Sequence, residues 1–175
     1  MITGQHIAET AINSGLLGRP YSEMDCQAFV EKVLQLAGLK IINYKGSNHM
    51  WRELVDERTP VKGNTPPAGA LAFIIKDDGG EKKRGYHDDM KNASHVAIVI
   101  DHQTVMESTT GGVQYGRLSR FTAFGLIKNV DYFEKGGADD AGERPTHYVK
   151  NQLVTILDEL KNNINRLERI INDDL

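Results

Sequence analysis

The pattern of hydrophobic and polar positions predicts two short helices near the start of the chain. Residues 5–17 carry apolar side chains at helical spacing. A second segment, from about 25 to 36, repeats that spacing and is followed by Gly38, a residue type that commonly ends helices. Residues 39–69 read as loop-rich, with one short helical candidate around 49–55.

Further along, the periodicity changes from helical to strand-like. Charged and glycine residues over 76–91 predict a long surface loop. The segment 101–103, between the apolar runs 95–100 and 104–107, is short enough to be the turn of a hairpin. We therefore predict strands after the helices, two of them joined as a hairpin. The four apolar runs that predict these strands are 69–75, 95–100, 104–107 and 122–127.

The composition changes again after residue 133. Residues 134–145 hold no apolar side chain larger than alanine before Pro145, which is typical of a linker. Residues 146–175 then predict an amphipathic, coiled-coil-like helix that forms a homo-oligomer; docking on the same chain or on a partner's helix are the alternatives. The domain prediction is thus 1–133, a linker at 134–145, and the helix at 146–175. Leu and Ile occupy an a/d seam at Leu153, Leu157, Leu160, Ile164, Leu167 and Ile171.

The bulk properties exclude several classes of function. A formal net charge of -3, with no basic stripe, argues against nucleic-acid binding. No apolar run approaches the ~20 residues that span a bilayer, so we expect no membrane insertion. The first residues lack a basic and apolar leader, so we expect synthesis in the cytoplasm without a signal peptide.

The candidate chemistry begins with the one cysteine of the sequence, Cys26, at the predicted start of the second helix. Backbone N–H groups and the positive end of a helix dipole favour a thiolate there. His95 opens an apolar strand and could supply the imidazole that a thiol nucleophile needs. The alternatives are a core cysteine and a structural histidine. A metal site built from 87–89 with His95 lacks a second histidine at ligand spacing, so we predict neither metal nor cofactor.

Three motifs carry a resemblance to a known family. Residues 25–30, Asp-Cys-Gln-Ala-Phe-Val, resemble the Asp-Cys-Ser/Gln-Gly-Leu/Phe-Val signature of NlpC-like cell-wall cysteine peptidases. Residues 69–73 are similar to that family's Gly-Asp-Leu-Val-Phe strand, with Ala70 in place of Asp. Residues 94–99 are similar to its His-Val-Gly-Ile-Tyr strand. The resemblance covers about residues 5–133, and other segments are similar to a prophage-encoded subgroup.

The resemblance implies a papain-like α+β fold, in which the Cys-bearing helix packs on an antiparallel sheet that carries the histidine. It implies hydrolysis of peptidoglycan stem peptides, commonly at the bond between D-γ-glutamate and a diamino acid. Cys26 would form a thioester acyl-enzyme and His95 would act as base and then acid. Glu107 stands where the family usually has histidine, and a carboxylate can orient an imidazole equally well. The alternative for Glu107 is an ordinary surface position on a strand.

The candidate substrate-binding residues are Tyr21, Ser94 and Trp51; core packing is the alternative for Tyr21 and Trp51. Asp25 is predicted to cap the helix. The leading functional prediction is a peptidoglycan endopeptidase of phage or prophage origin, released at lysis or carried on a virion. The alternatives are an N-acetylmuramoyl-L-alanine amidase of the cysteine-histidine type and a catalytically silent wall-binding or structural module of the same fold.

Overall fold

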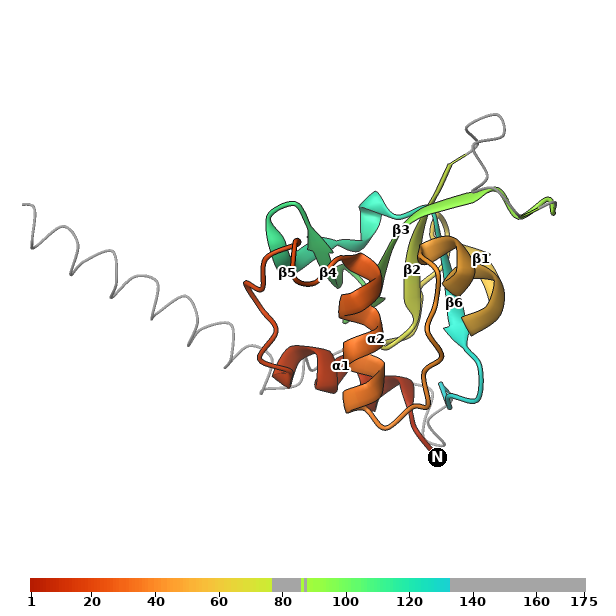
Figure 1. The fold of residues 1–175 in the computed structure, drawn as a ribbon. Coiled ribbons are helices and arrows are strands. Elements are labelled where there is room, and N and C mark those ends of the chain that lie inside the picture. The colour runs from red at the N-terminus through yellow and green to blue at the C-terminus, as the bar shows by residue number, and fades with distance from the viewer. Residues whose placement is uncertain (77–85, 87, 133–175) are drawn as a thin grey trace, which may run out of the picture. The chain divides into compact units, whose positions relative to one another are not determined.

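The computed structural model describes residues 1–76, 86 and 88–132. Within these residues the chain forms a mixed α+β fold with one six-stranded antiparallel sheet, which confirms the predicted class (Figure 1). The predicted linker at 134–145 and helix at 146–175 lie outside the described residues, as does most of the loop predicted for 76–91. The helical elements are α1 (Gly4–Asn13), α2 (Cys26–Leu36), α3 (Ser47–His49), the π-helical turn η1 (Met50–Leu54) and the 3-10 turn η2 (Leu118–Arg120).

The sheet has the strand order β1-β6-β2-β3-β4-β5. Two features of it shape the site. The register between β2 and β3 shifts where Ile74 faces His95 and Ile75 faces Ala93, which leaves Ser94 as the extra residue of a β-bulge. The strands are β1 (Val55–Pro60), β2 (Leu71–Lys76), β3 (Asn92–Val99), β4 (Thr104–Thr109), β5 (Gly112–Arg117) and β6 (Ala123–Ile127).

The second feature is the short pairing of β3 with β4. These strands pair at Ile98 with Met106 and at Val99 with Val105. Their pairing therefore lies next to the 101–103 turn, as the sequence predicts for a hairpin. Further from the turn, β3 and β4 are joined by a side-chain contact, that of His95 with Glu107.

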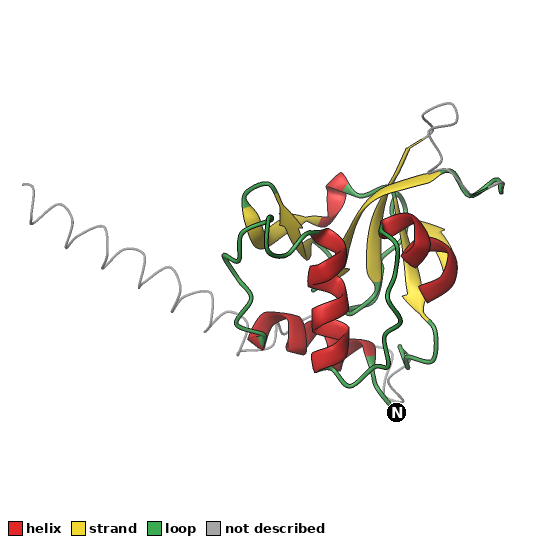
Figure 2. Cartoon of the chain, in the orientation of Figure 1, coloured by secondary structure: helices red, strands yellow, loops and turns green. Residues whose placement is uncertain are grey.

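Helix α2 covers the sheet at β3 and β4, and α1 packs on α2 (Figure 2). Helix α2 starts where it does because the Asp25 side chain accepts a hydrogen bond from the Ala28 N–H at 2.8 Å, which confirms the predicted cap. It ends at Leu36, and Gly38 follows with a φ of 88° that suits glycine; the Leu39 N–H then returns to the Leu34 carbonyl at 2.9 Å.

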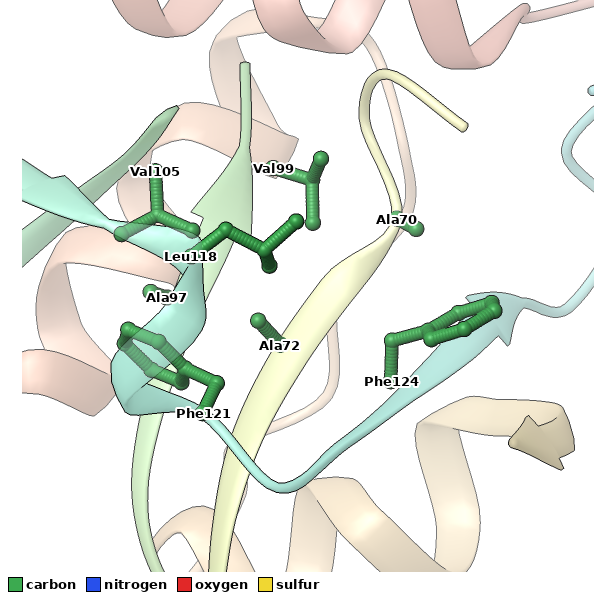
Figure 3. Packing of buried hydrophobic residues seen from close by; sticks show 8 residues of the cluster. All are labelled: Ala70, Ala72, Ala97, Val99, Val105, Leu118, Phe121 and Phe124. Carbon is green, nitrogen blue, oxygen red and sulfur yellow. The ribbon is translucent and has the colours of Figure 1, made fainter. Parts of the chain in front are cut away.

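One hydrophobic cluster forms where small side chains on the strands leave room for two phenylalanine rings (Figure 3). Residues two apart on a strand point to the same face, so β3 contributes Ala97 and Val99; Ala72 on β2 and Ala70 just before it lie beside them. The rings come from Phe121, just after η2, and from Phe124 in β6, so the cluster fixes the segment that follows β5. Its members are Ala70, Ala72, Ala97, Val99, Val105, Leu118, Phe121 and Phe124.

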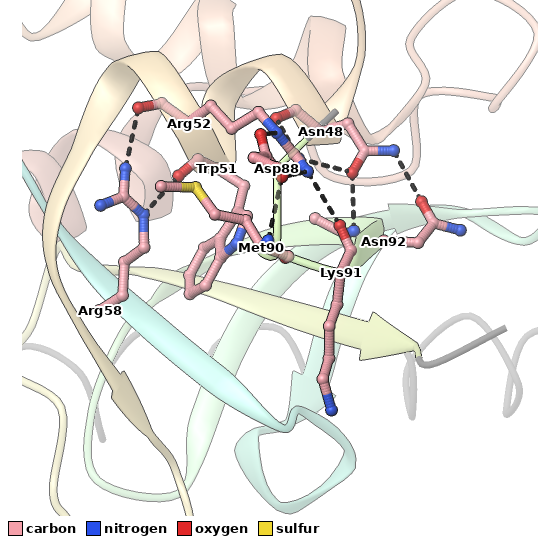
Figure 4. Close-up of polar contacts among 9 residues, drawn as sticks. Asn48, Trp51, Arg52, Arg58, Asp88, Met90, Lys91 and Asn92 are labelled. Atoms are coloured by element: carbon pink, nitrogen blue, oxygen red, sulfur yellow. Dashed lines mark hydrogen bonds and ion pairs between the residues drawn. The ribbon is translucent and has the colours of Figure 1, made fainter. Parts of the chain in front are cut away.

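A polar network ties the turn formed by α3 and η1 to the start of β3 (Figure 4). The buried Arg52 guanidinium makes two hydrogen bonds to the Asp88 carboxylate, at 2.6 and 2.7 Å. It also donates to Asn48, whose side-chain oxygen accepts from the Ala93 N–H at 2.8 Å. The network holds the bulged end of β3, two residues from His95.

Two strands were not predicted from the sequence. Strand β1 lies in the region read as loop and short helix, and β5 follows the predicted hairpin. Both lie at the edges of the sheet. Edge strands tolerate the charged, proline and glycine residues that hide a strand pattern. None of the helices in the described part of the chain has the length and apolar character needed to cross a membrane.

Candidate active site

The Cys26 side chain is half-buried at the first residue of α2. The first N–H groups of a helix have no carbonyl partner within the helix, so they and the dipole stabilise negative charge at this position. Asp25 does not compete for that space, because its carboxylate is engaged by the Ala28 N–H. The predicted placement of Cys26 at a helix start is confirmed.

The segment that leads to Cys26 is fastened to the β4–β5 hairpin at two points. The Gly18 N–H donates to the Val113 carbonyl at 2.8 Å, and the Val113 N–H donates to the Arg19 carbonyl at 2.9 Å. Closer to the cysteine, the Ser108 hydroxyl donates to the Met24 carbonyl at 2.5 Å. These contacts hold Tyr21 and the start of α2 beside the strand that carries Glu107.

His95 lies on β3, directly after the bulged residue, with 16% of its side chain exposed. Its Nε2 lies 2.7 Å from Oε2 of Glu107. An ionised carboxylate can only accept, so the imidazole N–H is the donor. Its ring stacks on Phe121 with 5.8 Å between centroids. Cys26 lies close enough to the imidazole to raise its pKa, and because Nε2 serves Glu107, Nδ1 is the ring nitrogen that remains available to the sulfur.

Glu107 on β4 is fully buried, which differs from the surface alternative considered for it. Its Oε1 accepts from Nη1 of Arg120 at 2.5 Å, so each carboxylate oxygen has a cationic partner. The space for this carboxylate comes from Gly116 on β5. A Cβ atom there would lie 2.1 Å from Oε1.

The pKa of His95 is raised from 6.5 to about 9. Burial by itself lowers this pKa, because it disfavours the charged imidazolium. Hydrogen bonds to Cys26 and to Glu107, together with their negative charges, act in the opposite direction and outweigh burial. At neutral pH the imidazole is therefore protonated.

Tyr21 is close enough to Cys26 to feel its charge. The pKa of the phenol is raised, first by the negative charge of the Cys26 thiolate, then by burial, by Asp25 and by a hydrogen bond to the sulfur. The side chain is 40% exposed. Tyr21 thus stands beside the sulfur.

The other two predicted substrate-binding residues are placed differently. Ser94, on the bulge, is exposed, and its hydroxyl donates to the Ile74 carbonyl at 3.2 Å. Trp51 is buried, with its ring against Phe73 at 4.9 Å and its Nε1 donating to the Met90 carbonyl at 3.2 Å. The structure gives Trp51 the core role that was its alternative.

Among the described residues, no group of three His, Cys, Asp or Glu side chains is arranged to hold a metal ion. In the segment considered for metal binding, His87 lies outside the described residues. Its neighbour Asp88 pairs with Arg52. That contact gives Asp88 a structural role.

Two residues of the site escaped the sequence reading. Arg120 lies on a short turn after β5, and no spacing rule links it to a carboxylate on β4. Gly116 faces Val105 across the hairpin, so its proximity to Glu107 requires knowledge of the β4–β5 register. A strand prediction for β5 with its register would have placed Gly116 near the site.

Neither the family models nor the curated proteins contain a match to this chain. The site geometry and the motif resemblance therefore carry the functional argument.

Proposed function

We propose that this chain is a papain-like cysteine peptidase of the NlpC-like type that hydrolyses peptide bonds in peptidoglycan stems. The observation that carries the proposal is the position of His95, which hydrogen bonds to the buried Glu107 and lies close enough to the thiol at the start of α2 for Cys26 to raise its pKa. A nucleophile, a proton carrier and an orienting acceptor in that order are what thiol-dependent acyl transfer requires.

In the proposed acylation step His95 starts as an imidazolium, because its pKa is about 9. Cys26 reacts as the thiolate, which the neighbouring imidazolium and the start of the helix favour. The sulfur attacks the carbonyl carbon of the scissile bond. The backbone N–H of Cys26 donates to the developing oxyanion, aided by the helix dipole. As the C–N bond breaks, His95 transfers its proton to the departing amine and a thioester remains.

In deacylation the roles reverse. Neutral His95 takes a proton from a water molecule, the resulting hydroxide attacks the thioester carbonyl, and the C–S bond breaks to regenerate the ion pair. Glu107 serves both steps by fixing the ring and by stabilising the imidazolium. Tyr21 is placed to bind the substrate near the sulfur, and Ser94 is a second candidate on the bulge.

The decisive test is digestion of purified sacculi, followed by mass spectrometry of the released fragments. We expect cleavage within the stem peptide, at the bond between D-γ-glutamate and the diamino acid. Cys26→Ala and His95→Ala should each lower the rate at least about a thousandfold without unfolding the domain. Full activity in either variant contradicts the assignment. His102→Gln, an exposed histidine in the β3–β4 turn, is the matched control.

Glu107→Gln should cost less, about a hundredfold at most, because the amide can still accept a hydrogen bond from His95. Wild-type rates in this variant would remove Glu107 from the mechanism. The masses of the fragments also separate the amidase alternative, which releases the intact stem peptide from the glycan. A protein that binds sacculi and releases nothing would be the silent module instead.

A further inference from the structure

The Glu107 carboxylate is shared between two cations that have very different access to water. Its own side chain is fully buried, whereas the Arg120 side chain is 50% exposed and that of His95 is 16% exposed. Oε2 lies 2.7 Å from the His95 ring nitrogen, and Oε1 lies 2.5 Å from Arg120 Nη1. Each oxygen is therefore assigned to one partner.

A carboxylate removed from water is costly to keep ionised unless another charge compensates for it. His95 cannot do so throughout a catalytic cycle, because it gives up its proton. Arginine keeps its charge at every relevant pH. When the imidazole is neutral, Arg120 is the partner that still holds Glu107 as an anion.

The space around the carboxylate is equally restricted. The absence of a side chain at Gly116 leaves room for Oε1, and the Arg120 hydrogen bond holds that oxygen there. With Oε1 held, the plane of the carboxylate is fixed and Oε2 faces the imidazole. The contact at Oε1 thus controls both the orientation and the charge of the Glu107 carboxylate.

We propose that Arg120 is a positioning residue that keeps Glu107 ionised and aimed at His95, so that the catalytic group is a relay of four side chains instead of three. The catalytic consequence rests on the proposed peptidase function. The structural relay from Arg120 through Glu107 to His95 stands without it.

Among the described residues, the charged or titratable groups that act on His95 are Cys26 at the start of α2 and Glu107 on β4. Behind them lie Arg120 on η2, which pairs with Glu107, and Tyr21 before α2, which interacts with Cys26 and Asp25. The Phe121 ring covers one side of the imidazole and carries no charge. A change at Arg120 must therefore reach His95 through Glu107 or directly through space.

These two routes predict opposite effects on the His95 titration midpoint, which NMR of the imidazole measures in the full-length protein without any substrate. If Arg120 acts through Glu107, Arg120→Gln makes the ionised carboxylate of Glu107 less stable and less well oriented. The imidazolium then loses stabilisation, and the His95 midpoint falls by about one pH unit. If it acts directly, loss of a like charge raises the midpoint. Arg120→Lys should restore most of the effect. Arg117→Gln, which removes an exposed arginine from β5, should change nothing.

The Glu107→Gln background completes the cycle. There, Arg120→Gln should no longer lower the His95 midpoint, since the carboxylate through which it acts is gone. An unchanged or raised midpoint in the single variant, or an equal fall in both backgrounds, would overturn the relay. Thermal melts of every variant identify any loss of folding, and the lysine variant retains the test if the glutamine variant is unstable.

Activity on sacculi gives a second readout. Arg120→Gln should lower kcat about tenfold with KM unchanged, and the loss should disappear in the Glu107→Gln background. A raised KM with unchanged kcat would instead mean that the guanidinium binds a substrate carboxylate, and it would refute the positioning role. If the wild-type chain cleaves no peptidoglycan, the proposed function fails, and the NMR cycle still decides the role of Arg120.

Discussion

The raised pKa of His95 makes the stability of the folded protein depend on pH in a defined direction. A group whose pKa is higher in the folded than in the unfolded state stabilises the fold below the unfolded value, and this contribution is lost as the pH rises through the folded value. For His95 the two values are 6.5 and about 9. The difference corresponds to about 3 kcal/mol of unfolding free energy at pH 6, which disappears by about pH 9.5.

The perturbation that isolates this contribution is His95→Gln, which removes the titrating group and keeps a polar side chain. Urea unfolding, followed by the fluorescence of the buried Trp51, gives the free energy of unfolding at each pH. The free energy of unfolding of the wild type should exceed that of the variant, and this difference should be about 3 kcal/mol larger at pH 6 than at pH 9.5. His102→Gln, in the exposed turn, should parallel the wild type throughout.

Two outcomes would refute the reasoning. If the wild-type and His95→Gln curves run parallel between pH 6 and 9.5, the imidazole does not gain its partners on folding. If the difference grows with rising pH, burial outweighs Cys26 and Glu107 and the pKa is lowered instead. Glu107→Gln should reduce the pH dependence without abolishing it, because Cys26 also raises the pKa of His95.

Three further substitutions test the supports of the site. Gly116→Ala places a Cβ 2.1 Å from Glu107 Oε1, so we expect about 1–3 kcal/mol of destabilisation in urea and slower hydrolysis of sacculi. An unchanged stability and rate would show that the carboxylate can move away. Asp25→Ala removes the cap of α2 and should cost about 1 kcal/mol, whereas Asp25→Asn should retain most of the stability in the same assay. Arg52→Met breaks a network whose guanidinium is buried and should lower the free energy of unfolding by about 3 kcal/mol. Asp56→Asn, at an exposed ion pair, should lower it by less than about 1 kcal/mol, and equal losses would contradict the importance of burial.

The elements with strong periodicity were predictable from the sequence. Helix α2 has an apolar face, a capping aspartate and a terminal glycine, and all three signals agree with its observed bounds. The buried strands β2 and β3 are equally clear, because both of their faces are covered. Strand β5, with sequence Gly-Val-Gln-Tyr-Gly-Arg, is too rich in glycine and polar residues to show an alternation. Its existence depends on pairing with β4, which is a long-range property.

The residues of the site likewise fall into those that local sequence signals place and those that only the tertiary fold places. The positions of Cys26 and His95 follow from local signals, a helix start and the first part of an apolar strand. The burial of Glu107 does not, because it depends on β5 and η2 closing over β4. The pairing of Glu107 with Arg120 joins two elements through the tertiary fold, so no reading of neighbouring residues could reveal it.

The double attachment of the segment before α2 to the β4–β5 hairpin has a consequence for how activity would be lost. The same hairpin carries Glu107, and it holds the cysteine segment through Ser108 and Val113. A transient opening of these two strands would release the nucleophile and the imidazole's acceptor in a single event. Amide exchange in the hairpin should therefore follow thermal inactivation step for step, while α1, which packs on α2, remains protected.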